Sequence, residues 1–141
     1  MTTSETSTRS VIVEKEFPHP PEKVWRALTE SSLLEQWLLK NDFEPVADRP
    51  FRLRREPVGD WNGVIDCKVI ALEPCKSLSY AWVAMGLETV VSWSLTRTDA
   101  GTHLRMEQSG FGPEMERNYK GATYGWQSML GKLEQVLTGL E

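Results

Sequence analysis

The chain has 141 residues, 40% of them hydrophobic, which suits one domain with a single core. Its 16 basic and 20 acidic residues give a net charge of -4, and this balance argues against a nucleic acid or an anionic membrane surface as the partner. The cysteines Cys67 and Cys75 are too few for a disulfide framework and lack zinc-ligand spacing, so we expect a cytoplasmic protein with no metal and no cofactor.

The first part of the chain predicts a tail, one strand and two short helices. Residues 1–9 are rich in Ser and Thr and lack an apolar run, so we expect a flexible tail rather than a signal peptide or a membrane span. The β-branched residues within 11–17 indicate a strand, and the prolines that follow end it. Apolar spacing predicts short helices near 20–29 and 31–38. Residues 10–141 are expected to form the single domain.

The middle of the chain has the sequence pattern of a β-meander. Runs rich in β-branched and aromatic residues alternate with turn residues, and the short connections favour antiparallel neighbours. In the run 63–72 both faces carry apolar residues, and a bulge could exchange the two faces midway, so the facing of this strand stays open. These runs predict five further strands, six in all, at 43–55 (with a break at 48–50), 63–72, 78–83, 89–97 and 102–109.

The last stretch, residues 112–141, predicts a long amphipathic helix. Its apolar residues recur at the three-and-four spacing of one helical face, and acidic residues near Pro113 suit a helix N-terminus. Gly121 and Gly125 lie inside this helix and suggest close packing or a bend. The order strand, two short helices, five strands and long helix indicates an α+β fold, with the helices on one side of an antiparallel sheet.

Several short motifs in this order resemble the family named for the activator of the heat-shock protein 90 ATPase, within the START-related (SRPBCC) helix-grip superfamily. The resemblance covers most of the chain. The fragments that carry it are residues 17–29 (FPHPPEKVWRALT), 34–37 (LEQW), 73–82 (EPCKSLSYAW), 101–104 (GTHL), 108–111 (QSGF) and 125–126 (GW).

The resemblance implies a helix-grip fold, in which a curved six-stranded sheet wraps around the C-terminal helix and leaves a cavity between them. It also implies that a small, largely hydrophobic molecule, such as a lipid, a sterol or a polyketide-like compound, binds in that cavity. Two alternatives stay open. One is a stress-response module that contacts a chaperone, and the other is a cyclase or hydrolase that acts on such a ligand.

Candidate ligand-binding residues are those that strand alternation, helical spacing and the resemblance place towards the cavity. Buried amides and phenols among them need a partner, and a ligand can supply one. Trp25 is assigned to the core instead, and Trp61 to a turn at the surface or at the cavity mouth. The candidates are Trp37, Tyr80, Trp82, Trp93, Met106, Gln108, Tyr119, Ala122, Thr123 and Trp126.

A catalytic set is harder to assemble from these residues. Neither His19 nor His103 has a nucleophile or a metal ligand at a suitable spacing, and the strand carboxylates lack evident pairing. An enzyme would have to use Tyr80, Gln108 or Tyr119 as proton donors. Ligand binding without catalysis is therefore the leading hypothesis, in a monomer or a weak dimer.

Overall fold

The computed structural model describes residues 9–57, 59–84, 86–112 and 115–140. The expected flexible tail lies outside these residues except for Arg9, which begins the first strand. In chain order the elements are β1 (Arg9–Phe17), α1 (Pro21–Thr29), α2 (Ser31–Trp37), β2 (Lys40–Asn41), β3 (Pro50–Arg54), β4 (Val64–Glu73), β5 (Ser77–Ala84), β6 (Leu87–Arg97), β7 (Thr102–Phe111) and α3 (Glu116–Gly139).

The strands form one antiparallel sheet in the order β1-β7-β6-β5-β4-β3-β2. The α+β helix-grip prediction is confirmed, with seven strands in the sheet where six were expected. The difference arises in the run 43–55, where only β3 is a strand and the short β2 lies just before the run. The N–H of Asp48, a residue at φ 65°, donates to the Val69 carbonyl, so this segment forms a loop before β3.

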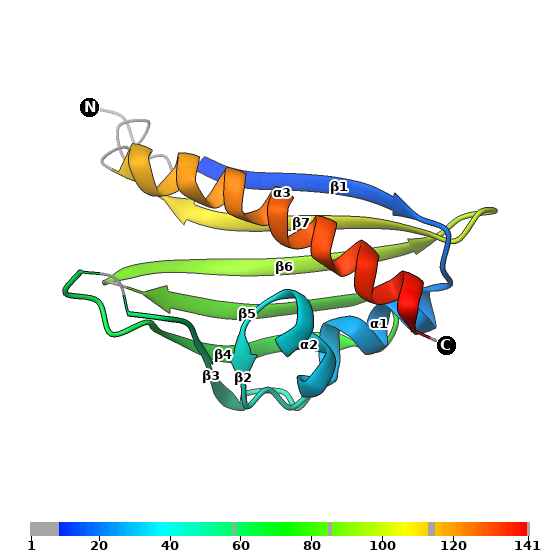
Figure 1. Ribbon diagram of the computed structural model, residues 1–141, viewed down its shortest axis with the longest axis horizontal. Helices are drawn as coiled ribbons and strands as arrows, with labels where there is room; N and C mark the ends of the chain where they lie inside the picture. The colour runs from blue at the N-terminus through cyan, green and yellow to red at the C-terminus, as the bar shows by residue number, and fades with distance from the viewer. Residues whose placement is uncertain (1–8, 58, 85, 113–114, 141) are drawn as a thin grey trace.

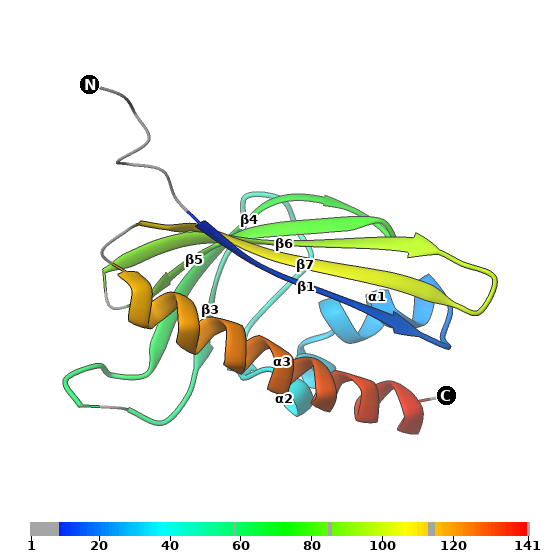
Figure 2. The ribbon, with the colours of Figure 1, turned by 90° about the horizontal axis from the view of Figure 1, so that it is seen from above.

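All three helices lie on the same face of the sheet (Figures 1 and 2). Helix α3 crosses this face diagonally and contacts β1 and α2. Its buried side chains recur at the helical spacing and are Trp126, Leu130, Leu133 and Leu137. The helix begins at Glu116 rather than near 112, and Pro113 and Glu114 lie outside the described residues.

Strand alternation holds in the central strands and positions the core. The buried side chains of β7 are Thr102, Leu104, Met106, Gln108 and Phe111. In β4 the pairing with β5 shifts register between Val69 and Ala71, which leaves Ile70 exposed. This bulge exchanges the buried and exposed faces of β4. The sequence had left open whether such a bulge occurs in this strand.

None of the helices in the described part of the chain is long and apolar enough to cross a membrane.

Candidate ligand-binding pocket

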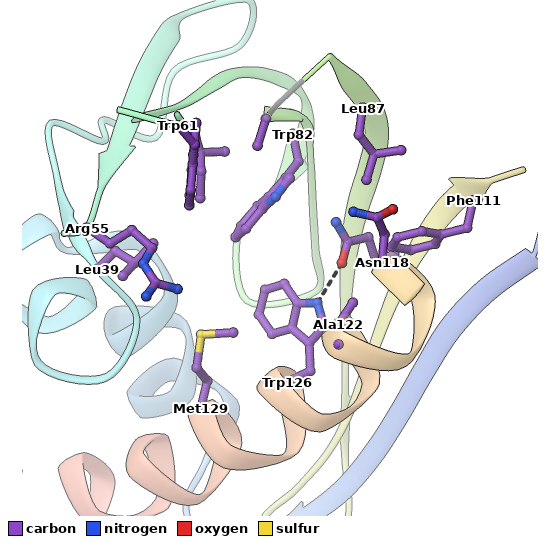
Figure 3. Close-up of a pocket in the computed structure, with 15 residues that line it drawn as sticks. Leu39, Arg55, Trp61, Trp82, Leu87, Phe111, Asn118, Ala122, Trp126 and Met129 are labelled. Carbon is purple, nitrogen blue, oxygen red and sulfur yellow. Dashed lines mark hydrogen bonds between the residues drawn. The ribbon is translucent and has the colours of Figure 1, made fainter. Parts of the chain in front are cut away.

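A pocket of about 280 Å³ opens between the first half of α3 and the neighbouring end of the sheet (Figure 3). Its walls come from α3, from strands β4 to β7, from the connection between α2 and β2 and from the loop between β3 and β4. The lining residues are Leu39, Arg55, Trp61, Ile65, Trp82, Ala84, Leu87, Gln108, Phe111, Asn118, Gly121, Ala122, Gly125, Trp126 and Met129.

Two indole rings form the centre of the pocket wall. The rings of Trp82 on β5 and Trp126 on α3 lie 5.4 Å apart between centroids, at an interplanar angle of 55°. Behind them, Trp93 meets Trp126 edge-on at 5.5 Å. Because aromatic pairs at such distances stabilise each other beyond their burial, the sheet and helix are held together at the pocket.

A chain of hydrogen bonds runs behind this aromatic wall. The Trp126 Nε1–H donates to Gln108 Oε1 at 2.7 Å, and Gln108 Nε2 donates to Thr89 Oγ1 at 2.8 Å. The Thr89 hydroxyl in turn donates to the Trp82 carbonyl at 3.0 Å. Gln108 is thus satisfied by side chains of the protein, and its amide holds the Trp126 ring in place at the pocket.

Small residues on α3 leave the space that becomes the pocket. Gly121, Ala122 and Gly125 all face it. A Cβ added at Gly121 would meet nothing within 4 Å, and one at Gly125 would meet only the Met129 Cε at 4.0 Å. Of the two alternatives, close packing or a bend, close packing is therefore wrong at these glycines, because they line open space.

The loop between β3 and β4 forms the opposite wall. It closes through the Arg55 N–H, which donates to the Gly63 carbonyl at 2.9 Å. A Cβ at Gly63 would lie 2.1 Å from the Arg55 carbonyl oxygen, and Gly63 has φ +83°, so this closure requires glycine. Trp61 is fixed by the bond from its Nε1 to the Val64 carbonyl at 3.0 Å, and the Arg55 guanidinium lies 5.9 Å from the Trp61 ring centroid.

Four of the ten candidate residues line the pocket, namely Trp82, Gln108, Ala122 and Trp126. The other six do not. Four of these are buried in the core, namely Trp37, Tyr80, Trp93 and Met106. The remaining two, Tyr119 and Thr123, lie on α3 but outside the pocket lining.

The contacts of four of these six residues explain their positions. Trp37 donates from Nε1 to the Ala27 carbonyl at 2.8 Å and meets Trp93 edge-on. The Tyr80 hydroxyl accepts a bond from Trp93 Nε1 at 2.9 Å, and burial raises the pKa of the Tyr80 phenol. The Tyr119 ring packs on Phe111 beneath the Arg9 guanidinium.

The sequence missed residues that come from strand ends and loops. Arg55 follows the last residue of β3, and Leu39 lies between α2 and β2, where no periodicity predicts a facing. Asn118 lies on the first turns of α3, on the side of the pocket across from Arg55 (Figure 3). Trp61 was expected at the surface or at the mouth, and it lies in the pocket wall, partly exposed.

Reactive side chains lie away from the pocket. His103, on β7, contacts Glu14 and Glu16 of β1, so the expectation that these carboxylates lack partners is wrong. Burial raises the pKa of the Cys67 thiol, which disfavours the nucleophilic thiolate. No group of three metal-ligating side chains occurs among the residues that the structure describes.

An antiparallel sheet that packs on a long C-terminal helix, with a pocket between them, defines the helix-grip class of domains. The sequence profile of the Activator of Hsp90 ATPase homolog 1-like proteins matches residues 18–138. The chain belongs to this family, whose domains typically bind small hydrophobic ligands.

Solved structures show the same fold. Protein MLL2253 from Mesorhizobium loti is 49% identical, with a TM-score of 0.87 over 94% of this chain and 99% of that one. Protein BH1534 from Bacillus halodurans is 25% identical, with a TM-score of 0.79 over 94% and 99%. DynU16, a putative protein in the dynemicin biosynthetic locus, is 26% identical, with a TM-score of 0.78 over 92% of this chain and 47% of that one. The curated proteins include no match to the chain.

Proposed function

We propose that the protein binds a small, largely hydrophobic molecule in the pocket between α3 and the sheet. The observation that carries the proposal is the pocket itself, whose lining is aromatic and aliphatic apart from three polar side chains. These are Arg55, Gln108 and Asn118. A mostly apolar concave surface with a few polar groups is the usual character of a small-molecule site.

The volume of the pocket narrows the range of ligands. About 280 Å³ lies at the lower end of the roughly 300–1,000 Å³ common in ligand pockets. A compound of one or two rings, or an acyl chain of medium length, suits this space better than a whole sterol. Of the polyketide-like compounds expected from the resemblance, only small aromatic fragments suit a pocket of this volume.

The enzymatic alternative has weaker support. Two of its three proton-donor candidates, Tyr80 and Tyr119, lie outside the pocket lining. The third, Gln108, has both amide atoms engaged with Thr89 and Trp126. Binding without a chemical step is therefore preferred, and the contact with a chaperone stays a prediction from the resemblance.

The test is a screen of aromatic and medium-chain compounds by ligand-observed NMR, followed by chemical-shift mapping of the six tryptophan indoles. A ligand in the pocket should shift the Nε1–H signals of Trp61, Trp82 and Trp126. Trp25 on α1 lies outside the lining and serves as an internal control. Binding that shifts Trp25 but none of the three lining indoles would contradict the proposal, as would no binding in the whole screen.

A further inference from the structure

We infer that the ligand of this pocket is an amphipathic monocarboxylate, whose apolar body lies against Trp82 and Trp126 and whose carboxylate pairs with Arg55. The inference rests on the proposed function and adds the chemical class of the ligand. It depends on the charge, the pairing and the position of Arg55.

Arg55 is the only charged residue among the fifteen that line the pocket. No acidic side chain shares the lining, so nothing there offsets its positive charge. The protein as a whole carries a net charge of -4. An anion would therefore be disfavoured by the overall field, and any preference for it must come from this one guanidinium.

The guanidinium of Arg55 forms no ion pair with the residues that the structure describes, and its side-chain contact is with the Trp61 ring. Several other arginines differ in this respect. Arg52 pairs with Asp66, Arg97 with Glu22 and Arg105 with Glu107. Arg55 thus keeps its donors available at a site where the protein offers no carboxylate of its own.

The backbone and the indole of the loop hold Arg55 at the pocket. The N–H of Arg55 is bound to the Gly63 carbonyl, and the Trp61 ring beside the guanidinium is fixed by its own hydrogen bond to Val64. Figure 3 shows the Arg55 side chain reaching towards the pocket from the side opposite Asn118. The planar guanidinium at this position can match a carboxylate through two parallel hydrogen bonds.

The experiment compares three probes that share one apolar body: 2-naphthoate, 2-naphthalenemethanol and 2-naphthylmethylammonium. Their dissociation constants are measured by titration calorimetry against the full chain. Because Arg55 is exposed, a charge-assisted bond to it predicts that 2-naphthoate binds about fivefold tighter than the neutral alcohol. The ammonium probe should bind weakest of the three.

Two variants with the same change in charge locate the effect. Arg55→Met should bring 2-naphthoate and the alcohol to within about twofold of each other. Arg54→Met removes the preceding arginine, which is exposed on β3 and does not line the pocket, and it should keep the fivefold preference. Thermal unfolding of both variants shows that they remain folded.

The outcomes separate this inference from the proposed function. If the alcohol binds as tightly as 2-naphthoate, the carboxylate inference is wrong while the proposed function stands. A preference for 2-naphthoate that survives in Arg55→Met would also overturn the inference. If none of the three probes binds, the carboxylate inference is wrong, while the proposed function is decided by the wider screen of aromatic and medium-chain compounds.

Discussion

The indole of Trp126 and the amide of Gln108 join α3 to β7 through a buried hydrogen bond of 2.7 Å. The bond lies at the pocket, where it fixes a ring that a ligand would contact. It also ends a chain that continues through Thr89 to the carbonyl of Trp82. Stability and pocket shape therefore depend on the same few polar atoms.

Gln108→Leu should destabilise the protein by about 1–3 kcal/mol, because it leaves the buried Trp126 N–H without an acceptor. Urea unfolding followed by tryptophan fluorescence measures the change. Gln127→Leu, at an exposed glutamine of α3, is the control and should stay within about 0.5 kcal/mol of the wild type. Equal effects of the two substitutions would show that the hydrogen-bond chain contributes little.

Ala122→Phe should abolish ligand binding while changing the unfolding free energy much less, because the new ring would fill the pocket rather than the core. Binding is measured with whichever compound the screen identifies, and unfolding with urea. Ser128→Phe places the same ring on the exposed side of α3 and should leave binding intact. A comparable loss of folding and binding in Ala122→Phe would mean that this half of α3 packs as solid core.

Substitutions of two glycines in α3 test the effects of helix stability and of pocket volume separately. Gly121→Ala and Gly131→Ala should each stabilise the protein by about 0.5–1 kcal/mol, since neither added methyl group would meet an atom within 4 Å. Only Gly121 lines the pocket, so only its substitution should weaken ligand binding. Thermal unfolding and calorimetric titration of both variants check the pair. Equal effects on binding would indicate that the ligand lies elsewhere.

His103 should make stability depend on pH. Hydrogen bonds from its ring to Glu16 and then Glu14 raise the pKa of the imidazole above its usual value. The stabilisation is therefore complete below the ordinary pKa of about 6.5 and is lost as the pH rises through the higher pKa of the folded state. Unfolding measured between pH 6 and pH 9 should show wild type losing its advantage over His103→Gln.

His19 provides a contrast of opposite sign. Its partial burial, followed by the charge of Lys23, lowers the pKa of its imidazole. Protonation therefore favours the unfolded chain, and His19→Gln should gain stability relative to wild type as the pH falls through 6.5. For His103, a difference in stability between His103→Gln and wild type that stays constant from pH 6 to pH 9 would contradict the role assigned to Glu14 and Glu16.

The sequence predicted the fold well because periodicity reports which face of an element is buried. Alternation placed Leu104, Met106 and Gln108 on one face, and all three are buried together. The short β2 escaped notice because two residues carry no period, and its partner β3 comes after a loop that resembles a strand in composition.

The pocket was predicted less well because facing does not give position along a strand. Trp82 and Tyr80 share a face of β5, but only Trp82 lies at the end of the sheet where α3 presents its small residues. Arg55 depends on a loop that only the Gly63 closure brings to the pocket. The one sequence feature that could have located the pocket is the pair Gly121 and Gly125 in α3, because both glycines line open space.

The pairing of β1 with β7 also has a consequence for how the protein folds. Arg9 lies opposite Phe111 and Phe17 opposite Thr102, so the first strand finds its sheet partner only after most of the chain exists. Strand β1 is the edge strand beside β7, so its backbone can enter the sheet only once β7 has been synthesised. Because pairing between segments so distant in the chain slows folding, we expect the joining of β1 to β7 to be a late step in folding.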